Sequence, residues 1–147
     1  MLSALDDRTV AYVVAAQPVF EDLRQVAAQL AGLLVLAATG SKESSPDHPM
    51  LGASKQALAH SEDGARRMGA LVTETARAHH HQLLSAHAAL QRALRAADAW
   101  PLDIDAVMRP LEQAYSHLQH GSRALPGFPM VAFEQGCCGT GRLVDSR

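Results

Sequence analysis

The chain has 147 residues, a length that suits one globular domain. Thirteen lysines and arginines against fifteen aspartates and glutamates leave a net charge of -2, so there is no electrostatic drive toward nucleic acid or an anionic membrane. The two cysteines, Cys137 and Cys138, are adjacent and cannot join distant segments. This excludes a disulfide framework of the kind found in small secreted proteins.

The amino-terminal region carries Asp6 and Asp7 where a secretory signal would carry positive charge, and no small-residue cleavage site follows. The longest strongly apolar run, residues 30–38, is far shorter than the roughly 20 residues that a membrane-spanning helix needs. We therefore expect a cytoplasmic protein that does not enter the membrane and whose fold depends on apolar burial.

Two helical segments are expected before residue 40. Ser3 can cap the first, because acidic residues follow in its first turn. Pro18 has no amide hydrogen and clashes with the preceding turn, which predicts a kink or a short break. Apolar residues at the helical period then continue to Gly40, where a left-handed stop is expected. Residues 40–49 are typical of a surface loop.

A longer apolar pattern with helical spacing extends over residues 51–97. No proline interrupts it, so it predicts one central helix of about 50 residues, about 75 Å long at 1.5 Å per residue. Gly64 and Gly69 weaken that helix by about 1 kcal/mol each relative to alanine. A fresh start capped by Ser61 is the alternative.

A shorter last helix is expected from its cap at Asp103 to Gly121, with a bend at Pro110. The fold class predicted is all-α: an antiparallel helical bundle with one very long central helix, a kinked first helix and a short last helix. Residues 1–121 form this bundle domain. Residues 122–147 are rich in glycine and proline and predict an irregular tail that packs on the bundle or on a partner subunit.

The expected helix lengths do not match, because a last helix of about 27 Å covers only one half of the central helix. The other half faces residues 31–38, which are apolar on every side and must be covered all round. A second copy of the chain, or the apolar start of the tail, can supply that cover. We therefore expect a homodimer with an apolar interface formed by Leu30, Leu33, Leu34, Leu36, Phe128 and Phe133.

Histidine is the polar residue that this chain overuses. His117 and His120 have the spacing that lets two side chains on one helix converge, and the proposed packing brings the central helix close to them. Imidazole and thiolate ligands suit zinc or another transition metal. The sequence thus offers one candidate metal site, formed by His80, His87, His117, His120, Cys137 and Cys138. The competing interpretation places His79 in the core and the other histidines in solvent.

Residues 59–64, Ala-His-Ser-Glu-Asp-Gly, resemble the phospho-accepting helix of histidine phosphotransfer domains, which are helical bundles of similar size. The match covers about a dozen residues: His60, a glycine four residues later and a second Gly-Ala step. Where that family has Leu-Lys before the first glycine, this chain has Glu62 and Asp63. The resemblance implies phosphotransfer by His60.

Other catalytic patterns are missing: the sequence has no glycine-rich phosphate loop after a strand and no Gly-x-Ser-x-Gly elbow. Three functions follow in order of preference. The first is a non-enzymatic protein–protein interaction or scaffold protein, homodimeric and without a cofactor. The second is a helical bundle that binds zinc, another metal or a small ligand. The third is histidine phosphotransfer at His60.

Overall fold

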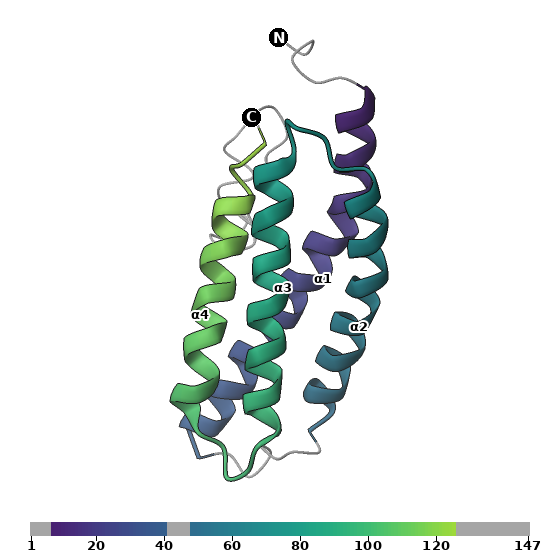
Figure 1. The fold of residues 1–147 in the computed structure, drawn as a ribbon. Coiled ribbons are helices and arrows are strands. Elements are labelled where there is room, and N and C mark those ends of the chain that lie inside the picture. The colour runs from purple at the N-terminus through teal and green to yellow at the C-terminus, as the bar shows by residue number, and fades with distance from the viewer. Residues whose placement is uncertain (1–6, 41–47, 126–147) are drawn as a thin grey trace, which may run out of the picture.

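The computed structural model describes residues 7–40 and 48–125, which form four helices packed together (Figure 1). In chain order these are α1 (Asp7–Ala38), α2 (Pro49–Ala70), α3 (Arg77–Asp98) and α4 (Ile104–Gly121). Successive helices run in opposite directions, and the described ranges contain no strand. The prediction of an all-α helical bundle is confirmed.

The predicted central helix of about 50 residues was wrong, because residues 71–76 separate α2 from α3. Neither Gly64 nor Ser61 marks the reversal, since both lie inside α2. A single rod of that length would leave much of its apolar stripe uncovered. The reversal lets one half bury Leu58 and Met68 and the other half bury Leu83, all within one molecule.

Helix α1 runs uninterrupted from Asp7 to Ala38, so the short break predicted at Pro18 does not occur. Proline offers no N–H to the carbonyl of Val14, but both residues are exposed and water can bond that carbonyl. Buried Val19 and Phe20 hold the helix on the core side. The predicted kink itself stays a prediction.

Two of the helices begin at residues whose side chains cap the first turn. The Asp103 side chain accepts a hydrogen bond from the backbone N–H of Ala106, which confirms the predicted cap of α4. His48 caps α2 in the same way, through Nδ1 and the N–H of Met50, with Pro49 in the first turn. The reversal at residues 71–76 has no side-chain cap at the start of α3. It therefore depends on tertiary contacts.

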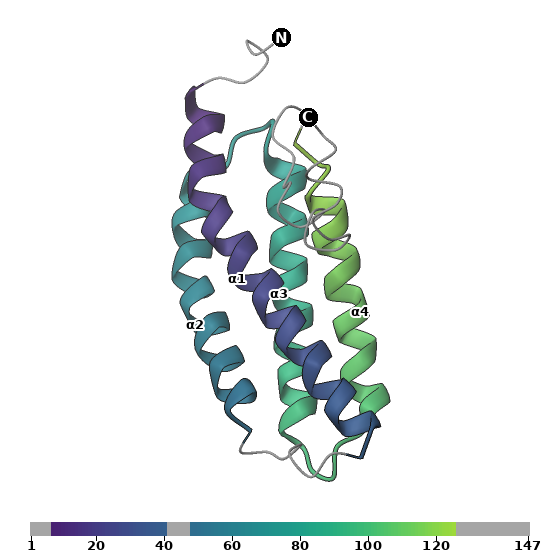
Figure 2. The same cartoon turned by 180° about the vertical axis from the view of Figure 1, so that it is seen from behind.

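Helix α1 crosses the bundle diagonally (Figure 2). Its first half packs on α2, and its last turns reach α4. The approach to α2 is close, because a Cβ built on Gly64 would lie only 2.7 Å from Cγ2 of Val19. No helix in the described ranges combines the length and hydropathy needed to cross a membrane.

Candidate functional site

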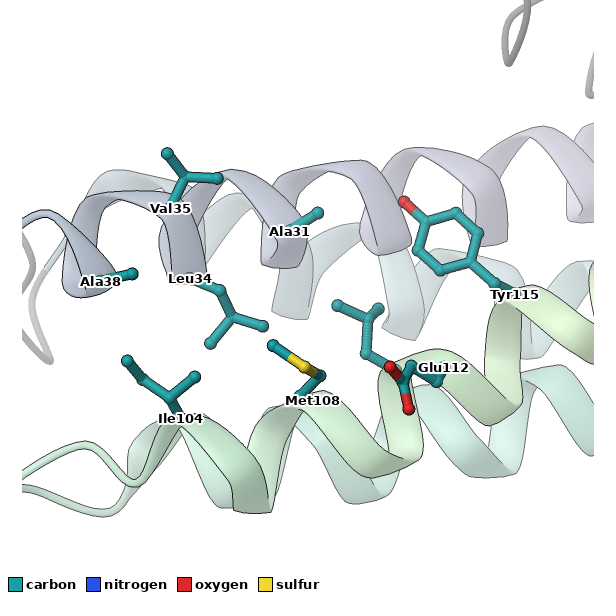
Figure 3. Close-up of a pocket in the computed structure, with 9 residues that line it drawn as sticks. Ala31, Leu34, Val35, Ala38, Ile104, Met108, Glu112 and Tyr115 are labelled. Atoms are coloured by element: carbon teal, nitrogen blue, oxygen red, sulfur yellow. The ribbon is translucent and has the colours of Figure 1, made fainter.

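An apolar groove lies where the last turns of α1 meet the first half of α4 (Figure 3). Its volume is about 290 Å³. Both walls are helical, and their side chains are almost entirely apolar. The lining residues are Ala31, Leu34, Val35, Ala38, Ile104, Met108, Leu111, Glu112 and Tyr115.

The floor and the rim of this groove differ in exposure. Leu34 and Leu111 form a buried floor. Val35 is 61% exposed and Met108 is 37% exposed, so large apolar side chains also stand at the edge, open to solvent. An apolar surface of this kind, concave and continued by exposed apolar side chains, is typical of a binding site for another molecule or segment.

The α4 side of the rim is charged. Glu112 lines the groove beside Met108. Arg109 follows Met108 in the sequence, which places it about 100° further round α4. Both charged side chains are exposed. In the part of the chain that the structure describes, neither of them takes part in an ion pair. The groove therefore combines an apolar centre with two opposite, unpaired charges at its edge.

Of the six residues predicted to form a dimer interface, three are buried, one is half-buried and two lie outside the described residues. Leu30 and Leu33 are each 1% exposed, and Leu34 forms the groove floor. The premise that this part of α1 needs a second copy was wrong, because α2 and α3 fold back and complete a four-helix bundle within one chain. Leu36 is half-buried. The remaining two, Phe128 and Phe133, lie outside the described residues.

The predicted metal ligands are not gathered into one cluster. No group of three or more histidine, cysteine, aspartate or glutamate side chains that could hold a metal occurs in residues 7–40 and 48–125. His117 Nδ1 lies 2.9 Å from Oε1 of Gln82, and His120 Nδ1 lies 2.8 Å from the carbonyl oxygen of Ser116. His87 is half-buried, and its Nε2 has no partner among the described residues.

Burial lowers the pKa of His80, and the neighbouring His81 adds to the effect. Burial likewise lowers the pKa of His117, with smaller contributions from nearby positive groups. Cys137 and Cys138 lie outside the described residues. The metal site as a whole therefore stays a prediction.

His60 stands on the exposed side of α2, with 68% of its side chain accessible. Its Nδ1 lies 2.8 Å from a carboxylate oxygen of Asp22 on α1. A carboxylate only accepts hydrogen bonds, so Nδ1 carries the proton and donates it. This arrangement fixes the ring and leaves the lone pair of Nε2 available to solvent. The sequence had no signal for Asp22, which lies 38 residues away.

A second pair of titratable groups is fully buried at the other end of α1. Tyr12 and His79 are joined by a hydrogen bond of 2.8 Å and have edge-to-face rings. Sequence reasoning placed His79 in the core but missed Tyr12 as its partner. The described chain provides no hydrogen-bond partner for Nε2 of His79. The pair is a structural contact between α1 and α3.

No protein-family model, curated protein or solved structure matches the chain.

Proposed function

We propose that the protein is a non-enzymatic interaction module that forms a homodimer through the α1–α4 groove. The single observation that supports this proposal is the composition of the groove rim. Val35 and Met108 expose apolar surface at its edge, and the opposite charges of Arg109 and Glu112 lie beside them.

A two-fold symmetric contact requires a self-complementary surface, in which residue i meets residue j of the partner and residue j meets residue i. Two α4 helices that pack antiparallel about a point between Arg109 and Glu112 satisfy this condition. Arg109 of each copy then faces Glu112 of the other beside the symmetry axis, and the apolar rims pack against each other around these charge pairs.

The groove is short, since residues 104–115 of α4 span about 17 Å at 1.5 Å per residue. Specific, stable interfaces bury about 1,200–2,000 Å² in total, and smaller ones are weak. We therefore expect a reversible dimer with a dissociation constant in the micromolar range.

The test is sedimentation velocity on the full chain over a concentration series. Val35→Glu should abolish the dimer, because it buries an unpaired charge in the apolar part of the contact. Val14→Glu is the matched control, because Val14 is a similarly exposed valine of α1, 67% accessible, that is not among the residues lining the groove. A native chain that stays monomeric at several hundred micromolar contradicts the proposal.

Charge reversal tests the symmetry separately. Arg109→Glu alone places like charges opposite each other at two equivalent points and should weaken the dimer at least tenfold. The double variant, Arg109→Glu with Glu112→Arg, restores opposite charges and should recover most of the affinity. Recovery distinguishes a two-fold contact at α4 from any other mode of association, which this exchange would not rescue.

Histidine phosphotransfer at His60 is a second candidate, favoured by the hydrogen bond to Asp22. An exposed imidazole whose Nδ1–H is held by a carboxylate presents Nε2 as a nucleophile, and the carboxylate stabilises the positive charge that develops on the ring. In reaction with phosphoramidate, the Nε2–P bond forms as the P–N bond of the donor breaks and ammonia leaves.

The corresponding experiment is site-resolved mass spectrometry after treatment with phosphoramidate. His60 should be phosphorylated faster than the exposed His120, and Asp22→Asn should slow the reaction at His60 alone. Equal rates at both histidines, unaffected by Asp22→Asn, would remove this candidate and leave the dimer proposal untouched.

A further inference from the structure

The described chain ends just after α4, the helix that forms one wall of the groove. Its last described residue, Leu125, is 2% exposed and lies just beyond α4. The groove runs along a side of this same helix, from Tyr115 at the near end to Ile104 at the far end (Figure 3). Any segment that follows Leu125 therefore starts from an anchored point at the carboxyl end of the helix that lines the groove.

The spacing of the next apolar side chains matches the length of the groove. Ile104 and Tyr115, at the two ends of the groove, are about 17 Å apart along α4, at 1.5 Å per residue. Phe128 and Phe133 are five residues apart, so in an extended chain, at about 3.3 Å per residue, they are also about 17 Å apart. The two phenylalanines therefore have the spacing needed to fill the two ends of the groove.

The composition of residues 125–133 also suits an apolar groove. Residues 125–133, Leu-Pro-Gly-Phe-Pro-Met-Val-Ala-Phe, contain no charged residue, and the first charge follows at Glu134. Proline at 126 and 129 is compatible with the extended backbone that this reach requires. Phenylalanine and methionine are the side chains that fill an irregular apolar groove most effectively.

We infer that residues 125–133 occupy the α1–α4 groove of their own chain and compete there with a second copy. The inference rests on the proposed function, since it describes how the same groove is regulated. A segment tethered at Leu125 competes with a second copy at an effective concentration in the millimolar range. A second copy binds only those chains whose segment has left the groove, so the segment weakens the dimer about tenfold and does not abolish it.

The first measurement detects the segment in its own chain. Trp100, the only tryptophan, lies four residues before Ile104, which begins α4 and lines the far end of the groove. Full-length protein with Cys138→Ser carries a dansyl acceptor on Cys137, four residues after Phe133. Energy transfer from Trp100 to this acceptor should be strong and independent of concentration. It should fall several-fold in the variant with Phe128→Ser and Phe133→Ser.

The matched control changes two apolar residues of the tail outside the segment, Leu143→Ser with Val144→Ser, and should leave the energy transfer unchanged. Equal transfer in the native chain and in the Phe128/Phe133 variant overturns the inference, whether or not the protein dimerises. Strong intrachain transfer in a protein that never dimerises contradicts the proposed function alone and supports occupancy of the groove.

The second measurement is the dimer dissociation constant of the same full-length variants. If the segment competes with a second copy, Phe128→Ser with Phe133→Ser should tighten the dimer about tenfold. A weaker dimer in this variant would mean that the phenylalanines belong to the contact between two copies, and would overturn the inference. An unchanged dissociation constant would overturn it too.

Discussion

The hydroxyl oxygen of Tyr12 on α1 lies 2.8 Å from Nδ1 of His79 on α3, and both side chains are fully buried. Burial raises the pKa of Tyr12 above its usual value. Burial, with a smaller contribution from His80, lowers the pKa of His79 to about 4. The pair is therefore neutral at physiological pH. Nearby, Thr9 and Thr73 share a second hydrogen bond of 2.8 Å, which holds the α2–α3 connection against α1.

The free energy of unfolding should decrease as the pH falls below about 6.5. In the unfolded chain His79 takes up a proton near pH 6.5, whereas in the folded protein it does so only near pH 4. Between these values the unfolded state binds more protons, so acid favours unfolding. The loss across this interval is on the order of 3 kcal/mol. Urea unfolding at pH 7.5 and pH 4.5 measures it.

His79→Leu is the comparison for this pH experiment, because it keeps an apolar side chain in the core and removes the titrating group. The variant should lose much less stability between the two pH values than the native chain. His117→Gln changes a more accessible ring and should affect the slope less. Parallel losses in the native chain and in His79→Leu would show that His79 does not control the acid sensitivity.

Tyr12→Phe should destabilise the fold by about 1–3 kcal/mol, because it leaves Nδ1 of His79 buried without a partner. A double-mutant cycle with His79→Leu isolates the hydrogen bond from the packing of the two rings. We expect a coupling energy of about 0.5–3 kcal/mol, measured by urea unfolding at pH 7.5. Additive effects of the two substitutions would contradict a direct contribution of this bond.

Gly64→Ala should destabilise the protein by about 1 kcal/mol or more. The new Cβ would lie 2.7 Å from Cγ2 of Val19, a stiff and buried side chain, so α1 and α2 must separate. Gly52→Ala is the matched control on the same helix, because its Cβ meets nothing within 4 Å. That substitution should stabilise α2 by up to about 1 kcal/mol.

Thermal unfolding of both glycine variants provides the comparison. Val19→Ala combined with Gly64→Ala should cost less than the sum of the two single substitutions, because the smaller side chain removes the clash. Equal stabilisation by Gly52→Ala and Gly64→Ala would rule out the close approach of α1 and α2 at Gly64.

Pro18→Ala should stabilise α1 by about 1–3 kcal/mol. Alanine restores an N–H for the carbonyl of Val14 and is the best helix former, and Pro18 itself is exposed, so little packing is lost. Gln17→Ala, at the exposed neighbouring position, should change the stability by less than about 0.5 kcal/mol. Urea unfolding of both variants measures the change in the free energy of unfolding. A destabilised Pro18→Ala would show that the ring makes a favourable contact.

Local sequence was sufficient for the helical class and for several helix ends. The apolar residues of α4 recur at helical spacing, and the cap at Asp103 and the end at Gly121 lie where these residues predict them. Such features depend on contacts within one or two turns, which short stretches of sequence encode. The pattern over residues 51–97 correctly predicted helix. It did not predict the reversal at 71–76, which has no glycine, proline or side-chain cap at its α3 end.

Only the tertiary structure decided how the apolar stripes are covered. When α3 folds back against α2, the apolar residues of both helices become buried within a single chain. No residue near the reversal predicts this stabilisation. The bond between Tyr12 and His79 joins residues 67 positions apart, and the groove depends on α1 crossing from α2 to α4. The sequence by itself determined which surfaces are apolar. Which apolar surfaces pack together depends on the arrangement of distant helices. The hydrophobic effect is not directional, so an apolar surface gains free energy from burial against any apolar neighbour.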